Sequence, residues 1–493
     1  MRLVSLIILT SMITIKGQTQ TKIAIHCDQE KYTMSGGIGA SWHAISEDSI
    51  DESPEYEYAL RYFHSRGSAW GGNPPVGHTY AWKQINKYAS WLGLSWLRVE
   101  LSMRMYEPER NQFQWDNEEM LALYKILDWA EVNNADVFLQ QMWSNVKWNS
   151  YPDVQPLLSA PKSLNDFAEG LARLVEHLLI NKKYTCIRWL CITNVPPGGS
   201  WGSWWSMGKQ DATITPALKE VRRVLDEKKL DILISGPDWT DLPIFDAKKI
   251  DFDQYIGAYD IHSYQGIDDA KQKNLEEWVI WARNHGKPLF LSEIGDMKLG
   301  WRDSNPGPKS FQAALSNAES VLRGMAVGVS AFNRWSYTNR GDLDGQWQLI
   351  RTWDAEKKKY YKEIEIEPVA FYGYGILTRF SIKNSSVVFT EPVNNTNILS
   401  QSLKSPSGEI TTFIINKSNK EQLIKLIISG ISNQHFFLYN VTESEIIKPD
   451  YKMNPVREII IKDGEEITLS IPGQSINTLT QLHILHKEPA RNK

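Results

Sequence analysis

Two short apolar segments each carry polar side chains spaced two residues apart. LSWLRVELS contains Arg98 and Glu100, and YIGAYDIHSY contains His262 and Tyr264. Residues with this spacing share one face of a β-strand, so each segment presents its polar groups to the same side. We therefore ask which further groups the fold would bring to that side.

A third segment, PLFLSEIG, carries a carboxylate at Glu293 near its end. Beside Arg98 and Tyr264, this carboxylate would be held ionised by the cation and oriented by the phenol. Such an environment suits a nucleophile. The alternative is a structural ion pair between Glu293 and Arg98, but a carboxylate at the C-terminal end of a strand favours a functional role.

These segments belong to an alternation of apolar strands and helical patterns that runs from about residue 37 to 360. The eight strand candidates are 36–44, 94–102, 135–143, 186–194, 231–236, 255–264, 288–295 and 328–336. The helix signals include Ser163 as an N-cap, and Thr215 as an N-cap with Pro216 at the first helical position. Eightfold alternation predicts an α/β fold, a (β/α)₈ TIM barrel.

After residue 380 the chain contains strand patterns separated by turns and no helices between them. This pattern predicts an all-β antiparallel sandwich domain. The early strand TKIAIHC is expected to pair with it. The predicted organisation is an N-terminal strand joining the sandwich at 21–36, a catalytic-type barrel at 37–380 and a β-sandwich at 381–487.

The first twenty residues have the layout of a secretory signal peptide, with Arg2 ahead of an apolar run that is too short for a membrane span. We therefore expect a secreted or periplasmic protein. The net charge of −4 and the mixed charges give no basic face for nucleic acid. The three cysteines do not form a disulfide framework, and the sequence contains no metal-ligand spacing and no cofactor motif.

The chain contains 20 Trp and 20 Tyr residues, whose flat apolar faces stack on sugar rings. Several tryptophans follow the predicted strands, where packing in the core does not explain them. Trp143 ends the third strand, and Trp201 and Trp204 lie in the loop after the fourth. A carbohydrate substrate or ligand is therefore the expected partner.

Three motifs extend this picture: KYTMSGGIGASWH at the first strand, FLSEIGD at the seventh, and PVAFYGYGILTRFSIKNSSVV at the exit from the barrel. Together they resemble the clan A glycoside hydrolases, in particular the glucosylceramidase and glucuronoxylanase group, which joins a barrel to a β-sandwich. The resemblance implies that Glu293 is the catalytic nucleophile. It also implies a subsite for the cleaved sugar shaped by Arg98, Asn194, His262, Tyr264 and Trp335.

One position departs from this resemblance. In ITNVPPGGSW, Val195 follows Asn194 where the clan has its acid/base glutamate. Valine can neither protonate a leaving group nor activate water, and such help is typically worth 10²–10⁴-fold in rate. Retaining hydrolysis therefore cannot proceed in its usual form.

Three interpretations remain open. Another residue replaces the acid, the candidates being Glu100, Asp238, Asp260 and His262. Alternatively, the substrate has a leaving group that needs no proton. In the third, the protein is a pseudo-enzyme that binds carbohydrate without cleaving it. The favoured expectation is a glycoside hydrolase-like protein acting on a β-linked glycan or glycoside through Glu293.

Overall fold

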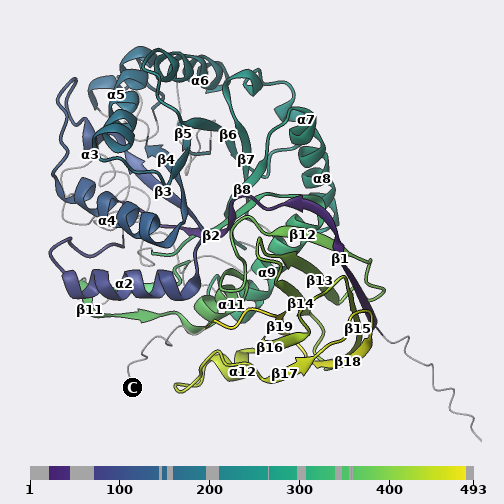
Figure 1. Ribbon diagram of the computed structural model, residues 1–493. Coiled ribbons are helices and arrows are strands. Elements are labelled where there is room, and N and C mark those ends of the chain that lie inside the picture. Colours follow the sequence, from purple (N-terminus) through teal and green to yellow (C-terminus); the bar gives the residue numbers. More distant parts are fainter. Residues whose placement is uncertain are drawn as a thin grey trace, which may run out of the picture.

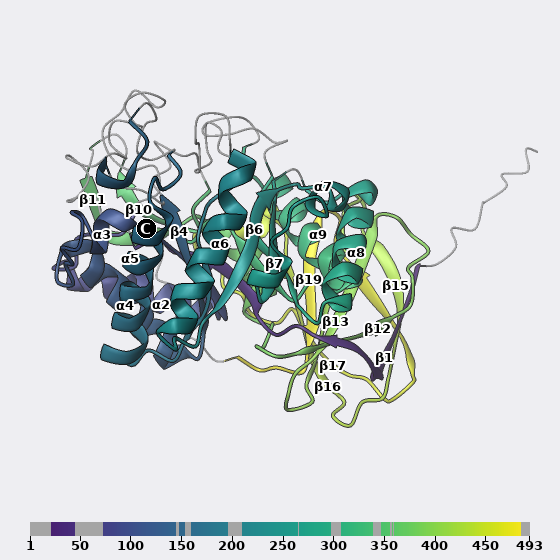
Figure 2. The same ribbon diagram turned by 90° about the horizontal axis from the view of Figure 1, so that it is seen from above.

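The computed structural model describes residues 21–44, 72–143, 147–152, 159–195, 210–264, 266–296, 307–338, 347–354, 357 and 359–484. The signal peptide predicted at residues 1–20 lies outside this part of the chain. A barrel surrounded by helices lies beside a large β-sheet domain (Figure 1). Viewed from above, the two domains remain adjacent, and the strand β1 (Thr21–Thr33) extends from one to the other (Figure 2).

Eight parallel strands close the barrel, which confirms the predicted fold class. They are β2 (Gly37–Ser41), β3 (Trp96–Ser102), β4 (Asp136–Trp143), β5 (Ile187–Cys191), β6 (Leu233–Thr240), β7 (Ala258–Ser263), β8 (Leu289–Ile294) and β9 (Ala331–Arg334). The barrel closes where β2 pairs with β9. Glycine is needed at position 39 because a Cβ there would lie only 1.5 Å from the carbonyl oxygen of Trp96.

Helices surround the barrel on its outer side (Figure 1). They are α2 (Thr79–Leu92), α3 (Met103–Tyr106), α4 (Glu118–Asn133), α5 (Leu164–Glu176), α6 (Gln210–Glu227), α7 (Ile244–Ala247), α8 (Asp269–Asn284), α9 (Phe311–Val327) and α11 (Pro368–Thr378). Ser163 caps α5 as predicted, since its hydroxyl accepts a hydrogen bond from the Asp166 N–H at 3.3 Å. The start predicted for α6 at Thr215 is wrong: the helix begins five residues earlier, and Pro216 lies inside it, where it removes one backbone donor.

Inside the barrel, apolar side chains fill one level and polar side chains lie above it. Trp96, Phe138 and Phe290 pack together with no more than 1% exposure. Two residues further along the same strand, Arg98 points into the interior at the next level. The apolar level supports the polar groups near the strand ends, where barrel enzymes have their sites.

The second domain is a nine-stranded sheet in the order β17-β16-β19-β14-β13-β12-β1-β15-β18. Its strands after β1 are β12 (Ser386–Thr390), β13 (Ile398–Lys404), β14 (Ile410–Asn416), β15 (Gln422–Ser429), β16 (His435–Val441), β17 (Arg457–Ile460), β18 (Glu466–Ile471) and β19 (Ser475–Thr480). The short helix α12 (Glu443–Ile446) follows β16. Pairing is antiparallel except between β1 and β15, which run parallel. Alternate residues from these strands form a separate apolar core, which confirms the predicted all-β domain.

The two domains are joined by packed side chains. The helices α9 and α11 lie between the barrel and the sheet (Figure 1). Thr478 donates a hydrogen bond to the carbonyl of Ile376 at 3.0 Å, and the rings of Phe380 and Tyr439 are 4.5 Å apart. Only a short connection separates α11 from β12, so the sheet is held firmly against the barrel.

The structure adds a two-stranded hairpin that we did not predict, formed by β10 (Ile350–Asp354) and β11 (Lys359–Ile366). It follows the last barrel strand and packs against α2. In the described part of the chain, no helix has the length and apolar character required to cross a membrane.

Candidate active site

The centre of the polar level is the guanidinium of Arg98, which is fully buried. Its Nη1 contacts the carboxylates of Glu100 and Glu293. Its Nη2 donates to Oδ1 of Asn194 at 3.0 Å and lies 3.8 Å from Oδ2 of Asp238. The surrounding carboxylates outweigh the effect of burial and raise the pKa of Arg98, so this cation stays charged and holds the side chains of four strand ends together.

Glu293, on β8, is the carboxylate to which the site residues converge. The Tyr264 hydroxyl donates to its Oε2 at 2.6 Å, and Nδ1 of His262 lies 3.2 Å from the same oxygen. Burial raises the pKa of Glu293 above its ordinary value, while Arg98 and His262 act against this shift. The arrangement orients both carboxylate oxygens and places cationic groups beside them.

His262 bridges Glu293 and a second buried carboxylate. Its Nε2 lies 2.9 Å from Oδ1 of Asp238. Burial lowers the pKa of His262, but the charges of Glu293 and Asp238 outweigh it, so the pKa lies above the ordinary value. The imidazole therefore favours its charged form between two carboxylates.

Val195 lies at the exit of β5, next to Asn194. Its backbone N–H is 3.1 Å from the carbonyl oxygen of Asp238 and 3.3 Å from Oδ2 of the same residue. The backbone of Val195 has a φ of 45°, which is unusual for a β-branched residue. Asn194 and Val195 are thus anchored from both sides, Asn194 by Arg98 and Val195 by Asp238.

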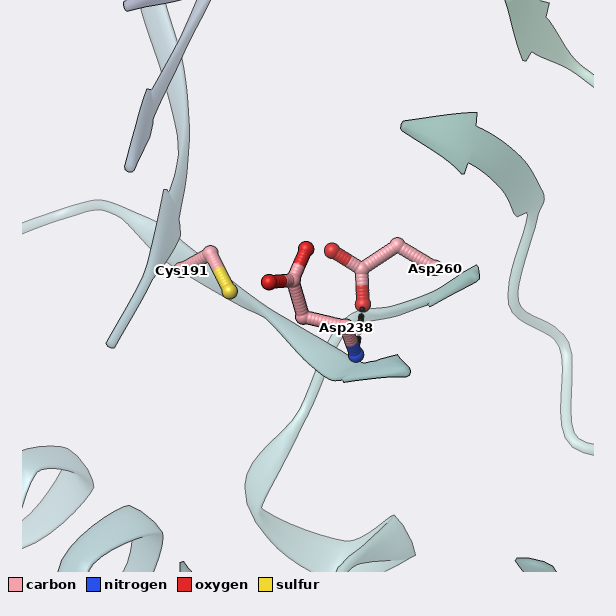
Figure 3. A group of neighbouring side chains, drawn as sticks. All are labelled: Cys191, Asp238 and Asp260. Carbon is pink, nitrogen blue, oxygen red and sulfur yellow. Dashed lines mark hydrogen bonds between the residues drawn. The ribbon is translucent and has the colours of Figure 1, made fainter. Parts of the chain in front are cut away.

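Beneath this site, Cys191, Asp238 and Asp260 form a buried group (Figure 3). Their potential ligand atoms lie within 4.8 Å of one another, a geometry that can be considered for a metal ion. The carboxylate oxygens already have donors, however: Asp260 accepts from the Asp238 N–H at 2.9 Å and from the Ser235 hydroxyl at 3.2 Å. Gln140 donates to Oδ2 of Asp238 at 3.1 Å.

The charges of this group differ between its two carboxyls. Burial and the nearby Asp238 carboxylate raise the pKa of Asp260 well above its ordinary value, which favours a protonated Asp260. Burial acts on Asp238 too, but His262 and Arg98 lower its pKa below the ordinary value. Burial also raises the pKa of the Cys191 thiol well above its usual range. In the structure as described, the group therefore combines one ionised carboxylate with a neutral carboxyl and a neutral thiol.

The structure describes the four residues that the sequence analysis considers as possible general acids. Glu100, Asp238, Asp260 and His262 have no exposed surface in the described structure. Glu100 is held by Arg98 and has Nδ1 of His43 2.7 Å from its Oε2. All four are thus buried and already hold partners among the described residues.

Trp335 lies at the edge of the site, at the end of β9. Its ring is 4.9 Å from the ring of His43, and Cζ of Arg98 lies 6.0 Å from its centroid. The ring is 4% exposed, so it is packed among the residues that hold Arg98. Trp143 is the last residue of β4, and its side chain lies outside the described part, as do Trp201 and Trp204 entirely.

The structure adds two residues that the sequence analysis did not select. Gln140 connects β4 to Asp238, and it also donates to the carbonyl of Thr193. His43, just after β2, contacts Glu100 and Trp335. Period-two alternation places Gln140 on the interior face of its strand, a signal that the sequence contains. His43 lies inside the strand predicted at 36–44, but the structure ends β2 at Ser41.

An eight-stranded barrel joined to a β-sheet domain is the architecture of a clan A glycoside hydrolase, the class that the sequence motifs resemble. The model of the family described as cellulase (glycosyl hydrolase family 5) matches residues 53–323, more than half of the 493-residue chain. The protein therefore belongs to glycosyl hydrolase family 5. No curated protein matches the chain by sequence.

Solved structures with the same fold include a GH30 endoxylanase from Clostridium papyrosolvens C71, with 14% identity and a TM-score of 0.64 over 93% of this chain and 99% of that chain. A conserved exported protein from Bacteroides fragilis has 13% identity and a TM-score of 0.65, covering 93% and 100%. An endo-β1,6-glucanase has 13% identity and a TM-score of 0.61, covering 93% of both chains. At these identities the likeness establishes the fold and leaves the substrate open.

Proposed function

We propose that the protein acts on a β-linked glycan or glycoside, with Glu293 as the nucleophile of a retaining-type reaction. The observation that supports this most directly is the convergence of Arg98, Tyr264 and His262 on one carboxylate at the end of β8. A carboxylate that served only as the partner of Arg98 in an ion pair would not need a phenol and an imidazole beside its second oxygen.

In this proposal each residue has a defined task. Glu293 attacks the anomeric carbon, Arg98 and Tyr264 orient the attacking carboxylate, and Asn194 binds a hydroxyl of the reacting sugar. Because Val195 supplies no proton, the proposed substrate has a leaving group that departs as a stable anion. Loss of general acid catalysis costs roughly 10²–10⁴-fold on poor leaving groups and much less on good ones.

A second candidate function rests on Val195 and on the burial of the four replacement candidates. In this alternative, the protein binds a carbohydrate in its cleft without cleaving it. The glycosidase fold is retained for recognition alone, since a fold by itself does not determine activity.

One experiment separates the two functions. The protein is incubated with a panel of dinitrophenyl β-glycosides, whose leaving group needs no proton, with and without azide, a nucleophile that needs no base. Dinitrophenol release that azide accelerates and that Glu293→Gln reduces by at least about 10³-fold supports the enzyme. No release from any sugar, together with glycan affinity that Glu293→Gln leaves unchanged, contradicts it and supports the binder.

The proposal places the protein outside the cytoplasm. It is supported by the signal-peptide layout of residues 1–20 and by a structural neighbour described as an exported protein. Expression in a bacterial host with periplasmic fractionation, followed by N-terminal sequencing, tests it. A mature chain in the periplasm that starts near residue 20 is expected, and an uncleaved chain in the cytosol would contradict export.

A further inference from the structure

A hollow on the outside of the barrel is separate from the residues around Glu293. It has a volume of about 700 Å³ and lies between the segment after α3 and the length of α5. We call it the α5 groove, and the residues that line it include Glu107, Phe113, Trp115, Asp166, Glu169 and His177. In Figure 1, α3, α4 and α5 lie on the side of the barrel away from the sheet domain. The volume is within the roughly 300–1,000 Å³ typical of small-molecule sites.

Aromatic rings form one wall of the groove. Phe113 and Trp115 stack with their centroids 5.5 Å apart and their planes 11° apart, and Trp115 stacks on His177 at 4.1 Å and 6°. The Tyr124 hydroxyl fixes this stack, because it lies 2.8 Å from both the Trp115 carbonyl oxygen and Nε2 of His177. Phe113 and Trp115 are half-buried, so their outer parts are available to a ligand. Rigid rings of this kind provide flat apolar surface.

The charged side chains of the groove are paired with one another or with adjacent cations. The pairs are Asp166 with Arg110 at 2.8 Å, Glu169 with Lys228 at 3.0 Å, and Glu176 with Arg173 at 3.0 Å. The groove is therefore polar but close to electrically balanced. This favours a neutral ligand with many hydroxyl groups over an anion or a polycation.

Glu107 is the exception among these carboxyls. It is 2% exposed, and its Oε1 accepts a hydrogen bond from the Asn111 N–H at 2.9 Å. Its Oε2 has no hydrogen-bond partner among the described residues, although it lies against Gly170 in the wall of the groove. A buried polar atom without a partner is costly, and a ligand hydroxyl at this point would remove that cost.

A cation is a weaker candidate for this position. Among the described residues, the one group of carboxylates, thiols or imidazoles close enough to hold a metal ion is the buried Cys191 group, and Glu107 is not part of it. The other carboxylates that line the groove, Asp166, Glu169 and Glu176, are each already paired with a basic side chain. They are therefore not free to hold a metal ion together with Glu107. A hydroxyl group, which can donate to a carboxylate or accept from a protonated carboxyl, fits the single free oxygen better.

We propose that the α5 groove is a second carbohydrate-binding site, in which a neutral saccharide packs against Phe113 and Trp115 and one of its hydroxyl groups forms a hydrogen bond with the Glu107 carboxyl. The site would hold a glycan chain on the flank of the barrel, away from the cleft. If the function proposed above is correct, the glycan bound in the groove can also be the substrate of the cleft. Binding in the groove itself does not depend on that function.

Affinity gel electrophoresis of the full chain tests the proposal, with xylan, β-1,6-glucan and hydroxyethyl cellulose as separate probes. All proteins carry Glu293→Gln so that no probe is cleaved during the run. Trp115→Ala and Phe113→Ala are each expected to weaken retardation in at least one glycan by roughly three- to tenfold. The matched control is Phe245→Ala, which removes a 70% exposed ring from α7 and should leave retardation unchanged.

Retardation that remains equal in the parent, the two groove variants and the control would overturn the proposal, as would a lack of retardation by all three glycans. Because Trp115 also packs on His177, the thermal unfolding of each variant is recorded, and the test rests on Phe113→Ala if Trp115→Ala unfolds early. A second measurement separates failure of this proposal from failure of the proposed function. Hydrolysis of dinitrophenyl glycosides, measured in the groove variants with Glu293 intact, tests the cleft and does not depend on the groove.

Discussion

The backbone N–H of Val195 points to both the carbonyl oxygen and Oδ2 of Asp238, at 3.1 and 3.3 Å. Asp238 is in turn held by His262 and Gln140. The main chain at Val195 is therefore fixed by Asp238 of the neighbouring strand β6. A new side chain at this position would start from an ordered backbone.

This anchoring predicts that Val195→Glu restores general acid catalysis. Hydrolysis of unactivated β-glycosides should rise by roughly 10²–10⁴-fold, while dinitrophenyl glycosides change little. The backbone should tolerate the change, because glutamate is not β-branched and suffers less than valine at a φ of 45°. Initial rates on alkyl and dinitrophenyl glycosides measure the effect. Val195→Gln, which has the same size and no acid, is the control, and an equal gain in both variants would contradict the prediction.

Arg98→Met should destabilise the protein strongly. The substitution leaves Glu100, Glu293 and Asp238 buried without their shared cation, and breaking a buried ion pair typically costs about 3–5 kcal/mol. Urea denaturation measures the loss. The control is Arg104→Met, which removes a partly buried arginine paired with Glu119 on the outside of the barrel and should cost less. A smaller loss at Arg98 than at Arg104 would mean that the buried carboxylates become protonated at little cost.

Much of the barrel can be predicted from the sequence because the hydrophobic period of a strand differs from that of a helix. The two patterns alternate eight times along the chain. Arg98, Tyr264 and Glu293 can be selected because alternation fixes the face of each strand and barrel topology brings the strand ends together. The resemblance to clan A hydrolases added Asn194. In the structure Arg98 contacts Glu293 and Asn194, and Tyr264 donates to Glu293.

Other features depend on long-range packing and could not be read from local patterns. The role of Asp238 depends on a left-handed backbone, with a φ of 58°, that turns its carboxylate toward His262 and its carbonyl toward Val195. His43 lies beyond the end of β2, although the predicted strand 36–44 contains it, and its contact with Glu100 comes from packing between strands. The start of α6 differs because the helix accommodates Pro216 inside it, although proline prefers the first turn of a helix.

The pH dependence of turnover should reflect the environment of Glu293. Burial raises its pKa, so the carboxylate becomes protonated and inactive at a higher pH than a free glutamate. The acid limb of the rate profile on dinitrophenyl glycosides should lie above the ordinary glutamate value of 4.5. His262→Asn removes a nearby cationic group and should move that limb to higher pH still. Phe113→Ala in the α5 groove is the control, and a limb that stays in place in His262→Asn would contradict the assignment.

The unpaired carboxyl of Glu107 predicts a pH-dependent contribution to stability. Burial raises the pKa of Glu107 to about 7, with the Asn111 N–H lowering it, Asp166 raising it and Arg110 lowering it by smaller amounts. The folded state therefore retains this proton after the unfolded state has lost it near pH 4.5, so its contribution to stability falls as pH rises from 4.5 to about 7.

Glu107→Gln removes this charge while keeping the size of the side chain. Relative to the parent, the variant should gain stability progressively between pH 4.5 and about 7, by about 3 kcal/mol at most, since one pKa unit corresponds to about 1.4 kcal/mol. Urea denaturation of both proteins at pH 4.5, 6 and 8 measures the difference. Glu443→Gln, which changes an exposed carboxylate on α12, should not show the same trend. A difference between Glu107→Gln and the parent that stays constant over this range would mean that Glu107 is ionised in the folded protein, and that its free oxygen is reached by water.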